Sequence, residues 1–366
     1  MYYTLFITHR CNLNCGYCYL ANKPATMPVS IARQIIDFIF SHNPSELKKN
    51  ISFSGGEPLL EFDVLKEIIS LIENHPAYDS KNVTISLITN GTIFSPEIAE
   101  FLKKHSVQFS VSCDGPPSVH DLFRKFPDGS GSSPIVERTI TQALEVFSSV
   151  KVHAVYHPET IRALPSMVDY LSSLGFSTVS VNPDFTAPWT LKEARILPEV
   201  YGKIAEKHIA SSLRRGQYII DFLDRKMHII LGGGYTESQK CGAGRGTLAF
   251  DHSGNIYACE KMIGLLESED QRIGSVRQGV QAEPLHMRRI PEHMSQAECL
   301  FCSIKDYCMH WCFCANYFSS GYINRTGPFL CYHEKATVQA VLNTLQMLQK
   351  TEGRSFPVHL RSYLPS

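Results

Sequence analysis

The sequence lacks an excess of charge of either sign and lacks a long apolar segment. Its 366 residues carry 35 basic and 35 acidic side chains, and charged residues make up only 19% of the chain. A neutral chain has no bulk attraction for nucleic acid or for anionic lipid. No stretch reaches the roughly 18 uninterrupted apolar residues of a membrane-spanning helix. We therefore expect neither nucleic acid nor a membrane as a partner.

The N-terminus also lacks the marks of an exported protein. Its apolar stretch is too short for a signal-peptide core, has no basic region before it and no small-residue cleavage site after it. The chain is 43% apolar and contains no low-complexity tract. These features predict a soluble globular protein of the cytoplasm with a sizeable core.

Cysteine, by contrast, is abundant. Three of the 12 cysteines lie within residues 11–18, Cys113 stands alone, and eight fall between Cys241 and Cys331. A disulfide scaffold needs an oxidising compartment and is typical of small chains without a core. In a reducing cytosol, clustered thiols more often hold metal ions or iron–sulfur clusters.

Up to about residue 183, β-branched runs alternate with amphipathic helical patterns. This alternation predicts an α/β fold with a parallel sheet and right-handed crossovers, either as an open sheet or as a partial (β/α)6 barrel of the TIM type. Chemistry in such folds gathers at the carboxyl ends of the strands. The predicted strands are 3–8, 51–53, 83–88, 107–112, 152–156 and 178–181, and the predicted helices are 31–40, 62–72, 96–103, 135–147 and 164–174.

The remainder of the chain differs in composition. Residues 188–234 are predicted to be a helical linker that ends at three consecutive glycines, and the chain after them is rich in cysteine, glycine and proline. The predicted segments are a barrel at 1–187, the linker at 188–234, a cysteine-rich domain at 235–335, and a C-terminal helix and tail at 336–366.

The first cysteines, Cys11, Cys15 and Cys18, come directly after the first predicted strand. Three thiolates can bind three irons of a [4Fe–4S] cube and leave the fourth iron open for a substrate or cofactor. A zinc site that recruits His9 as a fourth ligand is the alternative at this point.

The C-x3-C-x2-C spacing, followed by the aromatic Tyr19, resembles the signature of radical S-adenosylmethionine (SAM) enzymes. The resemblance implies that a [4Fe–4S] cluster on these cysteines cleaves SAM reductively to a 5′-deoxyadenosyl radical, which takes hydrogen from a substrate carbon. It also favours the partial (β/α)6 barrel over the open sheet, and it places Tyr17 beside the cofactor.

Further motifs follow in the order expected for that family. Gly55, Gly56, Glu57 and Pro58 come after the second strand and resemble the family's GGEP motif, which holds the amino group of SAM. Glycines allow close backbone approach, and a carboxylate can pair with an ammonium group. Asn90, in Thr-Asn-Gly at the end of the third strand, would line the same cavity.

The segment from Ser112 to Arg124 is similar to the SxDG…HDxxR segment of peptide-modifying members. The resemblance assigns Ser112 to the ribose and Arg124 to the carboxylate of SAM. A hydroxyl and a guanidinium fork suit these roles chemically. Cys113 occupies a variable position of the motif, and we expect a small buried residue there rather than a ligand.

The C-terminal cysteines have the spacing C-x12-G-x4-C, then C-x2-C-x5-C-x3-C, then a last cysteine. This pattern resembles the SPASM domain, which holds two auxiliary iron–sulfur clusters and would bring the total to three [4Fe–4S] clusters. A pair of zinc ribbons also fits the C-x2-C spacing but leaves the N-terminal cysteines unexplained. The resemblance implies that cluster I binds Cys241, Cys259 and Cys312, and that cluster II binds Cys299, Cys302, Cys308 and Cys331.

Two features of this region bear on mechanism. Cluster I has only three cysteines, so either Cys314 supplies the fourth ligand or one iron is open, in which case Cys314 is a spare thiol and the iron can bind a substrate thiolate. Glu260 directly follows Cys259, where protein-oxidising members carry an acidic residue thought to act as a base. A solvated Glu260 beside Lys261 is the structural alternative.

The motifs are most similar to those of maturases that modify ribosomally made peptides. Within that group the similarity favours a cysteine thioether cross-link, with a carbon–carbon cyclophane or a sulfatase-type formylglycine as alternatives. A non-catalytic iron–sulfur or zinc scaffold is disfavoured because Glu57, Ser112 and Arg124 are all present. The implied partners are a precursor peptide or protein and an electron donor such as flavodoxin or ferredoxin. Since Cys11 comes so early, either a separate leader-recognition protein or the barrel itself is expected to recognise the substrate.

Overall fold

The structure is a computed structural model that describes residues 1–42, 47–215, 219–264, 271–281 and 297–352. The chain forms two compact units, and both are assembled from segments that are not contiguous in sequence. Unit 1 contains Met1–Ser112, His120–Val150 and Gly242–Met287, and unit 2 contains Cys113–Val119, Lys151–Cys241 and Arg288–Ser366.

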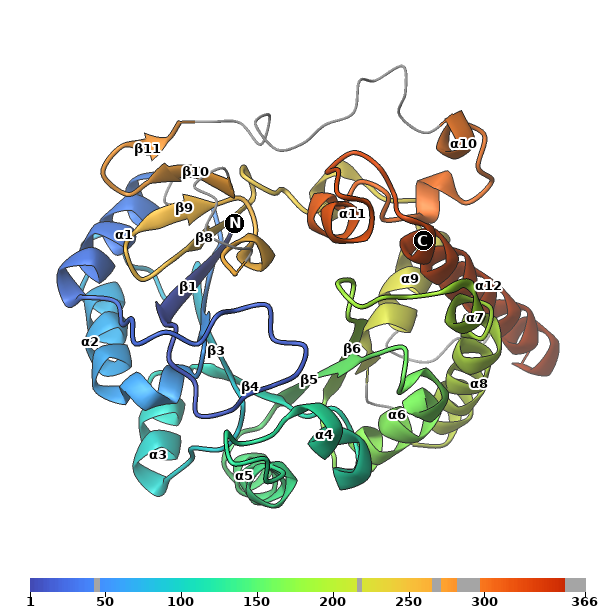
Figure 1. Cartoon of the computed structure of the whole chain (residues 1–366), viewed down its shortest axis with the longest axis horizontal. Helices are drawn as coiled ribbons and strands as arrows, with labels where there is room; N and C mark the ends of the chain where they lie inside the picture. Colours follow the sequence, from blue (N-terminus) through green and yellow to red (C-terminus); the bar gives the residue numbers. More distant parts are fainter. Residues whose placement is uncertain (43–46, 216–218, 265–270, 282–296, 353–366) are drawn as a thin grey trace. The chain divides into compact units, whose positions relative to one another are not determined.

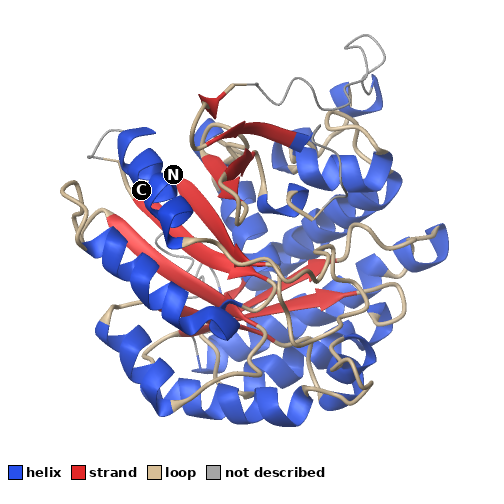
Figure 2. Cartoon of the chain, turned by 60° about the vertical axis from the view of Figure 1, so that its left-hand side comes forward, coloured by secondary structure: helices blue, strands red, loops and turns tan. Residues whose placement is uncertain are grey.

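The sheet of unit 1 contains parallel strands, with β1 between β8 and β2; strands are drawn in red in Figure 2. β1 (Tyr2–Thr8) pairs in parallel with β2 (Lys49–Gly55) and with β8 (Thr247–Phe250), so a strand from late in the sequence lies beside the first one (Figure 1). The parallel order continues from β2 to β3 (Val83–Thr89) and β4 (Gln108–Ser112). On the other side, β9 (Asn255–Tyr257), β10 (Arg272–Ser275) and β11 (Gly279–Val280) extend from β8 as antiparallel strands.

The burial of β1 explains its position. Six of its seven residues are buried, and Tyr3, Leu5, Phe6 and Ile7 are fully inaccessible. A near-continuous apolar run is typical of a parallel strand that is covered on both faces, whereas β2 and β3 alternate buried and half-buried side chains.

Amphipathic helices follow the strands of unit 1. They are α1 (Val29–His42), η1 (Pro58–Glu61), α2 (Phe62–Glu73), α3 (Pro96–Lys104) and α5 (Ser133–Val146). Each longer helix buries apolar residues at three- and four-residue spacing, and α1, α2 and α3 lie along one side of the strands (Figure 1). Ser95 caps α3 by accepting from the amide of Ile98, and Pro96 starts the helix. α4 (Pro117–Phe123) is divided between the units, and the short η4 (Glu260–Met262) belongs to unit 1.

Unit 2 combines three parallel strands with a helical layer. β5 (Val150–Tyr156), β6 (Thr178–Pro183) and β7 (Ile219–Ile220) pair in order. The long α12 (Pro328–Glu352) packs against α8 (Leu197–Arg215) and α9 (Asp221–Leu231). The shorter elements are η2 (Ile161–Ala163), α6 (Leu164–Ser173), α7 (Leu191–Ala194), η3 (Glu237–Gln239), α10 (Ala297–Leu300), η8 (Lys305–Tyr307) and α11 (Phe313–Ser320).

All six predicted strands and all five predicted helices of the first half form, with ends that differ by at most two residues from the sequence-based bounds. The α/β class is therefore confirmed. Closure into a partial barrel and the four-segment division of the chain stay predictions, and residues 353–366 of the predicted tail lie outside the described residues.

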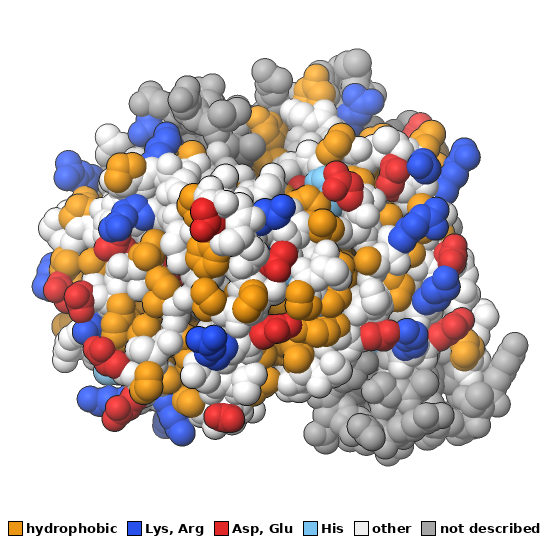
Figure 3. Space-filling model, turned by 60° about the horizontal axis from the view of Figure 1, so that its bottom comes forward, with side chains coloured by type: hydrophobic (Ala, Val, Ile, Leu, Met, Phe, Trp, Pro, Cys, Tyr) orange, Lys and Arg blue, Asp and Glu red, His pale blue; other side chains and the backbone are white. Residues whose placement is uncertain are grey.

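Charged side chains do not segregate on the face shown in Figure 3, where Lys and Arg are interspersed with Asp and Glu. This distribution agrees with the zero net charge of the chain. Among the helices of the described residues, none is long and apolar enough to cross a lipid bilayer.

Candidate functional site

The carboxyl ends of β1, β2, β3 and β4 lie at one edge of the sheet of unit 1, because the four strands are parallel neighbours. The loop with Cys11, Cys15 and Cys18 leaves β1 at this edge, Gly55 ends β2, and Asn90 follows β3. Ser112 is the last residue of β4. The strand register thus brings four separately predicted motifs together.

The two glycines at the end of β2 let the backbone of this segment touch the cysteine loop. The amide of Gly56 donates to the Thr8 carbonyl and that of Glu57 to the Arg10 carbonyl, both at 2.8 Å. A Cβ atom on Gly56 would overlap the carbonyl oxygen of Arg10, and Gly55 has a φ of +135°. Both positions therefore need glycine for physical reasons.

Glu57 is fully buried. Its Oε1 accepts from the amide of Leu59 at 3.0 Å and from the hydroxyl of Thr89 at 2.8 Å, and its Oε2 accepts from the amide of Asn90 at 2.6 Å. Burial raises the pKa of this carboxyl to about 7, although the three hydrogen bonds oppose the shift. A buried carboxylate with fixed orientation is suited to bind an ammonium group.

Asn90 connects the end of β3 to the cysteine loop. Its Nδ2 donates to Asn12 Oδ1 at 2.9 Å and approaches Cys11 Sγ at 3.6 Å, while its Oδ1 accepts from the amide of Thr92 at 2.9 Å. Asn12 in turn donates to the hydroxyl of Thr92 at 2.8 Å. The amide side chain predicted to line the cavity is therefore already oriented toward the first cysteine.

The cysteine loop is also fastened to the segment that carries Arg124. The amide of Asn14 donates to the Lys125 carbonyl at 2.7 Å and that of Gly16 to the Phe123 carbonyl at 3.0 Å. The guanidinium of Arg124 lies 5.4 Å from the centre of the Tyr17 ring, and the Arg124 side chain is buried. The structure thus places Arg124 beside Tyr17, as the two predicted cofactor contacts require.

Two neighbours of Arg124 have structural roles. His120 Nε2 lies 2.9 Å from the hydroxyl of Ser132. Asp121 accepts from the amide and hydroxyl of Ser133 at 2.9 and 2.6 Å, which satisfies the start of α5. These contacts fix the turn that presents Arg124. Cys113 is buried, as its small side chain predicts.

Cys11, Cys15 and Cys18 form no disulfide bond. Burial raises the pKa of Cys11, and the charge of Glu57 adds to this effect, while hydrogen bonds from Leu13 and Asn90 lower it. Cys11 and Cys15 are half-buried and Cys18 is exposed. The ring of His9, the alternative zinc ligand, packs edge-on against His252 with 4.7 Å between ring centres.

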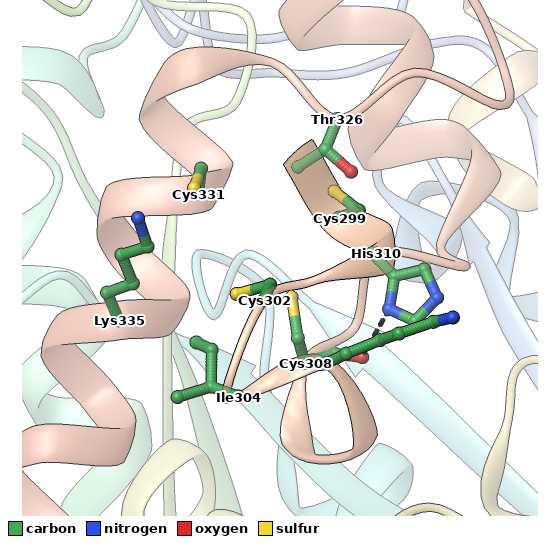
Figure 4. A pocket seen from close by; sticks show the side chains of 9 residues that line it. Cys299, Cys302, Ile304, Cys308, His310, Thr326, Cys331 and Lys335 are labelled. Atoms are coloured by element: carbon green, nitrogen blue, oxygen red, sulfur yellow. Dashed lines mark hydrogen bonds between the residues drawn. The ribbon is translucent and has the colours of Figure 1, made fainter. Parts of the chain in front are cut away.

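Four of the C-terminal cysteines line a single pocket of unit 2 (Figure 4): Cys299, Cys302, Cys308 and Cys331. Cys331 is on α12, and the other three belong to the segment that faces it. Lys305 and Lys335 also line this pocket. Thiolate donors with nearby cations suit an anionic iron–sulfur cluster, and within the described ranges no three His, Cys, Asp or Glu side chains are arranged to hold a single metal ion.

The other predicted cluster ligands are divided between the units. Cys259 belongs to unit 1, and Cys241 and Cys312 belong to unit 2, so their grouping stays a prediction. Cys312 and Cys314, at the start of α11, have their sulfur atoms 3.6 Å apart. Glu260 begins η4, and its Oε2 accepts from the hydroxyl of Thr4 on β1 at 3.3 Å.

Sequence reasoning missed several residues that hold this site together. Asn12 binds both Asn90 and Thr92, and Thr89 donates to Glu57. Lys261 lies over the ring of Tyr19, with 4.6 Å from Nζ to the ring centre. The Thr-Asn-Gly motif contained a signal for Thr89, because it directly precedes Asn90, but no sequence pattern pointed to Asn12.

Comparison with known proteins gives a consistent result. Residues 5–184 match the family model described as the radical SAM superfamily. The chain is 26% identical over 265 residues to an uncharacterized protein of Methanocaldococcus jannaschii. This match covers 71% of this chain and 85% of that protein. It is 24% identical to the radical SAM cyclopropyl synthase TigE of Paramaledivibacter caminithermalis, over 71% of this chain and 57% of TigE. It is 23% identical to the serine-type anaerobic sulfatase-maturating enzyme of Klebsiella aerogenes, over 82% of this chain and 76% of that enzyme.

Solved structures with the same fold extend over most of the chain. The structure described as native anSMEcpe with bound AdoMet and Cp18Cys peptide matches with a TM-score of 0.78 at 17% identity, over 96% of this chain and all of that one. SuiB of Streptococcus suis, bound to the precursor peptide SuiA, matches with a TM-score of 0.62 at 17% identity, over 90% of this chain and 75% of SuiB. At these identities the matches establish the fold.

Proposed function

Since residues 5–184 place this chain in the radical SAM superfamily, we propose that it is a radical SAM maturase that modifies a peptide or protein. The observation that carries this proposal is the convergence of the cysteine loop, Glu57, Asn90 and Arg124 at the carboxyl edge of the sheet of unit 1. A buried carboxylate next to the loop that carries three cysteines has the chemistry needed to hold the amino acid part of SAM near an iron–sulfur cluster.

In this proposal each residue has a defined task. Cys11, Cys15 and Cys18 bind three irons of a [4Fe–4S] cluster, and Glu57 binds the amino group of SAM. Arg124 binds its carboxylate, Ser112 its ribose, and Tyr17 packs beside it. When bound, the cluster and SAM supply a 5′-deoxyadenosyl radical, and the protein orients the cofactor and excludes water from it.

The auxiliary sites would serve the substrate. Cys299, Cys302, Cys308 and Cys331 bind one [4Fe–4S] cluster, and Cys241, Cys259 and Cys312 bind another with one open iron. Such an iron can hold a substrate cysteine as its thiolate and favour bond formation at that sulfur. Glu260 is the candidate base, because it directly follows Cys259.

We propose formation of a cysteine thioether cross-link on a ribosomally made peptide as the reaction. The missing fourth cysteine of cluster I supports it. Oxidation of a cysteine or serine to formylglycine is the second candidate, supported by the likeness to sulfatase-maturating enzymes over most of the chain. A carbon–carbon cyclophane is the remaining alternative. The electron donor would be a flavodoxin or ferredoxin, and the twelve cysteines, none of which forms a disulfide, favour the cytoplasm.

The first experiment measures iron, sulfide and SAM cleavage after anaerobic reconstitution. We expect about twelve irons per chain, falling to about eight in a Cys11/Cys15/Cys18→Ala variant that no longer forms 5′-deoxyadenosine from SAM. Little iron together with bound zinc, or SAM cleavage that survives in the variant, would overturn the radical SAM proposal.

Product mass then separates the candidate reactions. A thioether and a cyclophane both remove two hydrogens from the peptide, but only the thioether consumes the cysteine thiol, which then no longer reacts with iodoacetamide. Oxidation of cysteine to formylglycine removes the sulfur and leaves an aldehyde that reacts with hydrazides. An aldehyde product would reject the cross-linking proposal.

A further inference from the structure

A buried ion pair lies beside the four-cysteine pocket of unit 2. Lys226 Nζ on α9 is 2.7 Å from Glu334 Oε2 on α12, and the two side chains are only 5% and 1% exposed. Burying two charges has a desolvation cost that their mutual attraction often fails to offset, so such a pair is weak evidence for stability. Its other contacts indicate a different role.

Both members of the pair bind the backbone on either side of Cys308. Glu334 Oε2 also accepts from the amide of Met309 at 2.8 Å. Lys226 Nζ donates to the carbonyl of Tyr307 at 2.7 Å and to the hydroxyl of Tyr235 at 3.3 Å. The residue before and the residue after this cysteine are therefore fixed by the two charged side chains.

The pair also connects two of the predicted ligands to each other. Glu334 follows Cys331 by three residues on α12, which is close to one helical turn. Because Glu334 binds the amide next to Cys308, it fixes the Cys308 segment relative to the helix that carries Cys331. Cys308 and Cys331 line the same pocket, so their separation depends on this contact.

The two charges lie close to Cys308, because Lys226 binds the carbonyl of the residue before it and Glu334 binds the amide of the residue after it. Burial alone would lower the pKa of Lys226, but Glu334 and Tyr235 outweigh that effect and keep it above its ordinary value. The ammonium therefore remains charged at neutral pH.

We propose that Lys226 and Glu334 are positioning residues for the iron–sulfur cluster on Cys299, Cys302, Cys308 and Cys331, and that their opposite charges set its reduction potential. The inference rests on the proposed function, because it needs that cluster to be present. Side chains that orient metal ligands typically affect metal retention, and nearby charges shift cluster potentials.

The test uses the full chain and reads out iron, sulfide and the midpoint potential of the cluster by EPR-monitored titration. Glu334→Gln keeps the size of the side chain and leaves the Lys226 charge unbalanced, so we expect the potential to rise. Lys226→Met leaves the Glu334 charge unbalanced, so we expect it to fall. The Lys226→Met/Glu334→Gln variant should return toward the wild-type potential, and Lys226→Arg should stay close to it.

Two controls make the result specific. Asp224→Asn changes another buried ion pair of α9, between Asp224 and His208 at 2.8 Å, and should leave iron content and potential unchanged. Lys226→Ala removes the aliphatic part of the side chain as well as the Nζ contact with Tyr307, so we expect it to hold less iron than Lys226→Met, with a loss of up to about four of about twelve irons. SAM binding in unit 1 should persist in every variant and shows that the chain is folded.

The outcomes separate this inference from the proposed function. If Cys299→Ser holds as much iron as the wild type, the cluster is absent and the proposed function is at fault. If Cys299→Ser loses about four irons, the cluster is present. The positioning role is then wrong if the Lys226 and Glu334 variants keep the wild-type iron content and potential, or if both variants shift the potential in the same direction. Opposite shifts that cancel in the double variant would support it.

Discussion

The backbone amide of Asn90 donates a 2.6 Å hydrogen bond to the carboxylate of Glu57, although 33 residues separate the two in sequence. The side chain of Asn90 meanwhile reaches 3.6 Å from Cys11 Sγ. One residue therefore links the group proposed to bind SAM with a cysteine proposed to bind iron. The contact exists because β1, β2 and β3 are parallel neighbours whose carboxyl ends coincide.

Glu57→Gln should weaken SAM binding. Replacing the carboxylate removes a charge-assisted hydrogen bond to the SAM ammonium, which corresponds to roughly 10- to 100-fold in Kd. Equilibrium binding of SAM to the anaerobically reconstituted enzyme measures this. Glu61→Gln offers a control carboxylate that pairs with Arg10 at 2.8 Å and has no proposed cofactor role. Equal affinity of wild type and Glu57→Gln would contradict the assignment.

The same residue predicts a pH dependence of stability without SAM. The pKa of Glu57 is raised from 4.5 to about 7 in the folded state. Its favourable contribution to the free energy of unfolding is therefore complete below pH 4.5 and is lost as pH rises through 7. The difference in unfolding free energy between the wild type and Glu57→Gln should change by about 3 kcal/mol across this range. Urea unfolding of the cluster-free protein at several pH values measures it, and SAM should restore stability at high pH.

Gly56→Ala should destabilise unit 1. The added methyl group would overlap the carbonyl oxygen of Arg10, which is backbone and cannot move without shifting the cysteine loop. We expect a loss of about 3 kcal/mol or more in the free energy of unfolding. Gly202→Ala is the matched control, because nothing lies within 4 Å of its Cβ position. Similar melting temperatures for the two variants would show that the loop tolerates the methyl group.

Cys314→Ser should leave the iron content unchanged. Two thiolates on one tetrahedral metal ion with bonds of about 2.3 Å lie about 3.8 Å apart, and the sulfurs of Cys312 and Cys314 are 3.6 Å apart. Each iron of a cube takes one cysteine, so this close pair does not provide ligands to two irons. Iron analysis of Cys314→Ser and Cys312→Ser tests this expectation, and a loss of about four irons in Cys314→Ser would assign the fourth ligand to it.

His333 predicts a loss of stability in acid. Burial lowers its pKa from 6.5 to about 4, with the charge of Glu334 opposing the shift and that of Lys226 adding to it. The neutral ring lies with Nδ1 at 2.6 Å from the hydroxyl of Tyr201. The unfolded state binds more protons between these pKa values, so stability should fall by about 3 kcal/mol from pH 6.5 to 4. His333→Gln should flatten this part of the pH profile.

Much of the candidate site could be predicted from the sequence because its chemistry lies in short local motifs. The spacing of Cys11, Cys15 and Cys18 and the Gly-Gly-Glu-Pro run each indicated a ligand without tertiary information. The family match over residues 5–184 confirms the resemblance to radical SAM enzymes, and the ligand roles of these residues stay predictions. The alternation of β-branched runs and amphipathic helices likewise determined the element order, since periodicity depends on which residues must be buried.

Long-range pairing was decided only by the tertiary structure. Nothing in residues 247–250 indicated that β8 would join β1 in parallel, and no motif linked Lys226 and Glu334 to the backbone beside Cys308. Local patterns specify which face of an element is buried, but not which distant segment covers it. That choice depends on packing and hydrogen bonding between segments far apart in sequence, and it is what brings Glu57 to Asn90 and Glu334 to Met309.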